Sequence, residues 1–220
     1  MERNGSNAFS FRFLAFFPGG GHPVKGMLAG CRVEITVPFA AGLAFLLLAD
    51  RTGAVACGIL AAALHEGGHL LMLRLQKRRV CGLRLTIFGA QIRAHTAQSH
   101  YSKDAALFLA GPAANLLALV VCSILPVPAL AMFRTANALL GFVNLLPVGP
   151  LDGGQALFCL LQMHFSARRA RQIVQVVSFV VLLPLAAAGF LLLFRSRWNF
   201  TLLVMAVYLL FLLLLKPDRA

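Results

Sequence analysis

The sequence predicts an all-α polytopic membrane protein with about six transmembrane helices and one small, membrane-associated β-hairpin. Apolar residues make up 60% of the chain, charged residues make up only 12%, and the mean hydropathy is +0.82. Soluble domains contain far fewer apolar residues. Several apolar stretches reach the roughly 20 residues that cross a hydrocarbon core, which leaves little sequence for an extramembrane domain.

The net charge of +13 comes from basic residues that gather at the ends of the apolar stretches. Such clusters are typical of topology signals and of lipid-headgroup contacts, so we expect no direct binding of nucleic acid. The 5 cysteines lie mostly within apolar stretches and have no close spacing. They predict neither a disulfide framework nor a cysteine-based zinc site.

Residues 1–32 are expected to form an irregular cytosolic or interfacial arm. Arg12 interrupts its apolar part, which argues against a signal peptide. Phenylalanines throughout this segment suit the headgroup region of a bilayer.

Two further segments follow the arm. Residues 33–163 are expected to form a catalytic core with four transmembrane helices, and residues 164–220 to add two more, without a CBS or PDZ domain. The expected spans are 33–49, 53–74, 105–125, 129–146, 174–194 and 200–215. A short helix is expected at 155–163.

The hairpin is expected at residues 80–95, between the second and third spans. Leu83, Leu85 and Ile87 alternate with polar residues, and the chain can turn at Phe88 to Ala90 before it returns to Ala94. An ordinary polar connection is the alternative.

The distribution of basic residues predicts the orientation of these spans. With both termini in the cytosol, 16 of the 20 Lys and Arg residues lie on the cytosolic side of the six-span arrangement. This bias is the positive-inside pattern. We therefore expect a multi-pass protein with cytosolic termini.

The second span carries the sequence His65-Glu66-Gly67-Gly68-His69. On a helix, positions i and i+4 lie on one face, so His65 and His69 can bind one metal ion with Glu66 beside it. A charged side chain inside a membrane needs a compensating partner, and a metal dication is the simplest one. The alternative is a pair of histidines that only form hydrogen bonds between packed helices.

A third ligand is expected from the broken end of the fourth span. Two prolines and three glycines in residues 147–154 cannot continue a helix, and irregular backbone at membrane depth must face protein or a cavity. Asp152 emerges from this segment, unless it only caps the short helix that follows. In the third span, Pro112 should free backbone carbonyls, and Asn115 should point inward.

Two histidines, one carboxylate and a water molecule form an open zinc site of the catalytic kind. Such a site lowers the pKa of the bound water and polarises a substrate carbonyl. Glu66 is placed to take the proton of the water and pass it to the leaving amine. One Zn²⁺ per chain is therefore expected.

The three motifs, His65 to His69, Gly111 to Asn115 and Leu151-Asp152-Gly153, resemble those of the site-2 protease family of intramembrane zinc metalloproteases. The resemblance is closest to the branch that processes a sporulation sigma factor precursor. It implies that His65, His69 and Asp152 are zinc ligands, that Glu66 is the catalytic acid and base, and that Asn115 lines the active site.

The resemblance also implies a membrane-associated protein substrate, such as a sigma factor precursor, and a membrane-bound inhibitor or regulator. The location would be the bacterial cell membrane or a membrane around the forespore. The chain departs from the branch in two features. We expect no C-terminal CBS domain, which many members carry, and Pro150-Leu151 stands before Asp152 where some members have Asn-Pro.

A substrate helix must unwind before its carbonyls can react, and the hairpin Leu83 to Ala94 is a candidate edge for binding the unwound segment. The main alternative function is transport of a metal ion or proton, because buried His and Asp residues also mark ion pathways. An inactive scaffold that retains the pattern is a further alternative.

Overall fold

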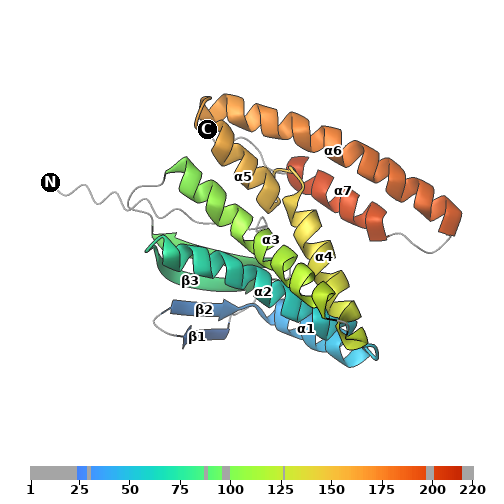
Figure 1. Ribbon diagram of the computed structural model, residues 1–220. Coiled ribbons are helices and arrows are strands. Elements are labelled where there is room, and N and C mark those ends of the chain that lie inside the picture. Colours follow the sequence, from blue (N-terminus) through green and yellow to red (C-terminus); the bar gives the residue numbers. More distant parts are fainter. Residues whose placement is uncertain are drawn as a thin grey trace.

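The computed structural model describes residues 24–28, 31–86, 89–95, 100–125, 127–196 and 201–214. These residues form helices and one small sheet (Figure 1). The strands are β1 (Val24–Leu28), β2 (Cys31–Ile35), β3 (Arg79–Thr86) and β4 (Gly89–His95). The helices are α1 (Val37–Ala49), α2 (Ala54–Leu75), α3 (Tyr101–Ile124), the 3-10 turn η1 (Pro128–Leu130), α4 (Ala131–Leu145), α5 (Asp152–Leu161), α6 (Ala167–Ser196) and α7 (Thr201–Leu214).

The four strands form one sheet in the order β1-β2-β3-β4. Strands β1 and β2 pair antiparallel, β2 and β3 pair parallel, and β3 and β4 pair antiparallel. The expectation of an irregular arm up to residue 32 is therefore wrong for residues 24–28 and 31–32, which are in strands. Residues 33–35 also belong to β2, so the first helix begins at Val37 and not at residue 33. Residues 1–23 lie outside the described residues.

The segment expected as a hairpin contains β3 and β4, with Leu83 opposite Ile92 and Leu85 opposite Ala90. The expected turn residues 87 and 88 lie outside the described part of the chain. Strand β3 also pairs with β2, as Leu85 lies opposite Ile35. Strand β3 is therefore an interior strand, and β1 and β4 are the edges of the sheet.

Among the described residues, three helices are long and apolar enough to cross a membrane, namely α2, α3 and α6. The chain is thus a membrane protein. Helices α1 and α7 are apolar but shorter, and α4 has 15 residues. At 1.5 Å per residue, such short helices span only about 20 Å of a hydrocarbon core of about 30 Å. Helix α1 has no buried residue, which suits a helix surrounded by lipid.

Helix α3 lies at the centre of the helical part and packs against α2, α4 and α5. Helices α6 and α7 pack against each other on the side away from the sheet (Figure 1). They contact the rest of the chain through α5 and through an apolar cluster that includes Val148, Leu182 and Leu209. The segment that precedes α5 is therefore held between the central helices and the α6–α7 pair.

A tight turn fixes the start of α2. The Asp50 carboxylate accepts hydrogen bonds from the Thr52 hydroxyl and from the N–H groups of Thr52 and Val55. These bonds, led by that from the Thr52 hydroxyl, lower the pKa of Asp50. Gly53 follows with a φ of 79°, a backbone conformation that favours glycine.

Candidate metal centre

One face of α2 presents the two histidines to the protein interior. Its buried residues are Ala61, His65, His69 and Leu73, each four positions after the last. This spacing places them in one stripe along the helix. A Cβ on Gly68 would lie 2.5 Å from the Ala110 carbonyl oxygen, so the glycine allows α2 to approach α3 closely next to His69.

Asp152 is the first residue of α5, after the irregular segment 146–151. The two glycines that follow allow the tight path of this segment, because a Cβ on Gly153 or Gly154 would collide with the carbonyl oxygens of Leu145 or Val148. The hydroxyl of Ser178 on α6 accepts a hydrogen bond of 2.9 Å from the Gly149 N–H. Asp152 is fully buried, with an exposed fraction of 0%.

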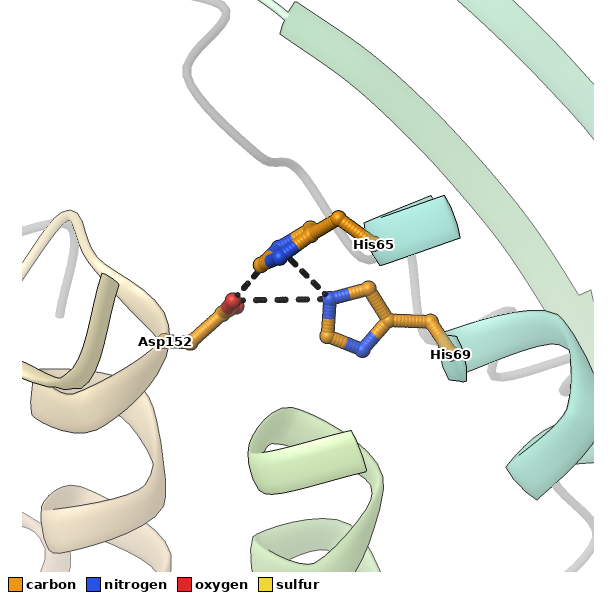
Figure 2. Close-up of side chains that lie close together, drawn as sticks. All are labelled: His65, His69 and Asp152. Atoms are coloured by element: carbon orange, nitrogen blue, oxygen red, sulfur yellow. Dashed lines mark hydrogen bonds and ion pairs between the residues drawn. The ribbon is translucent and has the colours of Figure 1, made fainter. Parts of the chain in front are cut away.

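Three side chains meet at this point, two from α2 and one from α5 (Figure 2). The Oδ2 atom of Asp152 lies 2.9 Å from Nε2 of His65 and 3.4 Å from Nε2 of His69. The two Nε2 atoms lie 3.2 Å apart. The structure therefore brings together the three residues that the sequence predicts as ligands.

The hydrogen bonds at the two Nδ1 atoms determine whether each Nε2 atom carries a proton or a lone pair. Nδ1 of His65 lies 2.6 Å from the Asn115 Oδ1 atom, and Nδ1 of His69 lies 2.8 Å from the Leu107 carbonyl oxygen. Each neutral ring then carries its proton on Nδ1 and presents a lone pair at Nε2. Leu107 lies on α3, five residues before Pro112.

Asp152 completes a group of electron-pair donors. Both of its carboxylate oxygens are buried and have no hydrogen-bond partner among the described residues. Two imidazole lone pairs and a carboxylate in contact repel one another unless a cation lies between them. The cluster therefore fits a metal ion.

The spacing is compatible with a tetrahedral zinc ion. Zinc bonds to nitrogen and oxygen are about 2.0 to 2.1 Å long, and neighbouring ligands of a tetrahedron are then about 3.3 Å apart. The three separations of 2.9, 3.2 and 3.4 Å lie close to this value. Asp152 does not act as a helix cap, because Leu151 holds the N-cap position and the carboxylate accepts no backbone hydrogen bond that the structure describes.

Gly111 of α3 leaves the space beside the two imidazoles open. A Cβ at this position would lie 2.3 Å from Nε2 of His69 and 2.8 Å from Nε2 of His65. A residue with a side chain at position 111 would therefore clash with the two imidazoles, which explains why this position of the motif is a glycine.

Glu66 and Asn115 are the two other predicted site residues, and both lie next to His65. Glu66 is partly buried on α2 and follows His65 directly in the chain. Asn115 is fully buried and contacts the ring of His65 from behind, on the Nδ1 side. Asn115 thus contacts His65 on the side of the ring opposite to Asp152.

Asn137 and Ser178 are fully buried polar residues that no sequence motif singles out. Asn137 of α4 is fully buried and accepts a hydrogen bond of 2.9 Å from the Asn115 amide. The signal for Asn137 is the same as that for Asn115, namely a polar side chain within an apolar span.

Comparison with known proteins gives similarities of three kinds. Residues 126–185 match peptidase family M50. Over 136 residues, the chain is 30% identical to stage IV sporulation protein FB of Bacillus subtilis (strain 168), a match that covers 58% of this chain and 46% of the relative. The chain thus spans about half the length of that relative.

A solved structure has the same fold. The site-2 protease from Methanocaldococcus jannaschii aligns with a TM-score of 0.60 and 18% identity, over 90% of this chain and 97% of that protein. The sequence match to family M50 includes Asp152 and the irregular segment before it. The sequence and the fold therefore agree that this chain is similar to the site-2 proteases of peptidase family M50.

Proposed function

We propose that this protein is an intramembrane zinc metalloprotease, with His65, His69 and Asp152 as the ligands of one zinc ion. The observation that carries the proposal is the convergence of two imidazole lone pairs and one buried carboxylate from α2 and α5. The similarity to peptidase family M50 and the fold of a site-2 protease support it.

Three protein ligands leave a fourth position for water, and zinc bound there would make this water more acidic and polarise a peptide carbonyl. Glu66 follows His65 on the same helix and is the acid and base of the proposal. Its carboxylate takes the proton of the attacking water as the oxygen bonds to the carbonyl carbon. It then donates this proton to the amide nitrogen as the C–N bond breaks.

The proposed substrate is a segment of a membrane-associated protein that is bound in extended form. Strand β4 pairs with β3 on one side, and its other edge has no strand partner among the described residues. Exposed strand edges bind extended peptides through backbone hydrogen bonds. We assign this role to β4, within the segment Leu83 to Ala94.

The proposed arrangement in the membrane has six spans and cytosolic termini, with α1, α4 and α7 as the three short spans. The positive-inside distribution of Lys and Arg supports it. The name of the Bacillus subtilis relative and the resemblance to its branch suggest a role in sporulation, with a sigma factor precursor as substrate and a membrane-bound regulator.

The Glu66→Gln variant tests this function. The purified variant should retain about one zinc ion per chain and lose cleavage of a membrane-associated substrate, because the ligands remain and the base is absent. Flux of zinc or protons into vesicles that contain the wild-type protein, unchanged in the variant, would instead support a transporter.

A further inference from the structure

The geometry points to Asn137 as a positioning residue that acts on the metal centre through Asn115. This inference rests on the proposed zinc site and adds a residue outside its ligands. The contacts form one chain from α4 to α2. The Asn137 amide donates to the Phe133 carbonyl at 2.8 Å, and its Oδ1 accepts from the Asn115 amide at 2.9 Å. The Asn115 Oδ1 atom then lies 2.6 Å from Nδ1 of His65.

Two backbone carbonyls determine the direction of every bond in this chain. A carbonyl oxygen only accepts hydrogen bonds, so Asn137 must turn its NH₂ group toward Phe133 and its oxygen toward Asn115. The Asn115 NH₂ group also donates to the Ala61 carbonyl at 3.0 Å. If the Asn115 amide were flipped, its oxygen would face two other acceptors, the Ala61 carbonyl oxygen and Oδ1 of Asn137.

The fixed amide of Asn115 in turn fixes the tautomer of His65. Because Oδ1 of Asn115 faces Nδ1, the ring proton is held there and the lone pair is held at Nε2, toward Asp152. Asn137 supplies one of the two acceptors that hold the Asn115 amide. Both asparagines are fully buried, where competing water cannot replace these bonds.

Loss of the Asn137 acceptor should therefore weaken metal binding. Partners of metal ligands affect metal affinity by about 10- to 100-fold, and Asn137 lies one residue further away, so we expect about tenfold. Two variants with opposite changes in volume separate this effect from packing. Asn137→Leu removes every polar atom, and in Asn137→Ser the shorter hydroxyl turns to the Phe133 carbonyl in its own helix.

The test is a measurement of the zinc dissociation constant of the full-length protein by competition with a chelator. Both Asn137 variants should bind zinc about tenfold more weakly than the wild type. In the Asn115→Ala background, the same substitutions should change the constant less than about twofold, because the residue through which Asn137 acts is gone. Thr135→Val on the same helix is the control, since the Thr135 hydroxyl bonds only to the Ala131 carbonyl among the described residues.

Equal losses in the wild-type and Asn115→Ala backgrounds would show a packing effect and overturn the inference. If both Asn137 variants bind zinc as tightly as the wild type, the inference about Asn137 is also overturned, but the proposed function stands. A wild-type protein without bound zinc would contradict the proposed function itself, and the inference with it.

Discussion

The Oδ2 atom of Asp152 lies 2.9 Å from Nε2 of His65, and neither atom carries a proton when Asp152 is ionised and the neutral ring of His65 holds its proton on Nδ1. Two lone-pair donors in such contact repel each other, and a cation between them removes this repulsion. This relationship is the physical basis for a metal ion at the junction of α2 and α5.

Removal of the metal should destabilise the wild-type protein. A ligand that binds only the folded state stabilises it by about 4 kcal/mol at a thousandfold excess over its dissociation constant. A chelator should therefore lower the midpoint of thermal unfolding in detergent. In Asp152→Ala the chelator should have little effect, and the metal-free variant should unfold at a higher temperature than the metal-free wild type.

Gly111→Ala should prevent metal binding while the fold remains. The added methyl group would occupy the space beside the Nε2 atoms of His65 and His69. The matched control is Gly67→Ala, because a Cβ on Gly67 has no neighbour within 4 Å among the described residues. Zinc content should fall well below one ion per chain in the first variant and stay near one in the second. Equal zinc content in both would contradict the predicted steric role of Gly111.

Asp104→Leu should destabilise the protein without involving the metal centre. Arg78 and Asp104 form a buried ion pair of 2.6 Å that links the start of β3 to α3. Removal of one partner leaves a buried charge, at a cost of about 3 to 5 kcal/mol, whereas replacement of both by apolar residues is often nearly neutral. The double variant Arg78→Met/Asp104→Leu should therefore recover most of the loss in an unfolding assay. A double variant as unstable as the single one would contradict this account of the pair.

Ile92→Pro tests the binding of substrate at the edge of β4. The substitution should lower cleavage and leave zinc content unchanged, because proline cannot donate a hydrogen bond and disturbs the edge. Ile92→Val is the control, because valine keeps the backbone N–H and a β-branched side chain at this position. Equal cleavage by the wild type and both variants would contradict the assignment. Proline at Leu85 is less informative, because Leu85 lies on the interior strand β3.

Much of the metal centre can be predicted because its signals are local. The spacing of His65 and His69 places them on one helix face, and the prolines and glycines around Asp152 end a helix at the same depth. Both signals depend on residues close together in the chain, and the structure brings the three side chains together.

The parts that could not be predicted depend on contacts between distant segments. The parallel pairing of β2 with β3 joins residues on either side of two helices, and β1 and β2 are short segments without a clear alternation. Asn137 is one of several asparagines in the apolar spans, and only the packing of α3 against α4 identifies the one that contacts Asn115.

The most direct test of the proposed centre is the zinc X-ray absorption spectrum of the purified wild-type protein. We expect about one zinc ion per chain with only nitrogen and oxygen ligands at about 2.0 to 2.1 Å, two of them imidazoles. Sulfur ligands at about 2.3 Å, or a protein without bound metal, would contradict this expectation.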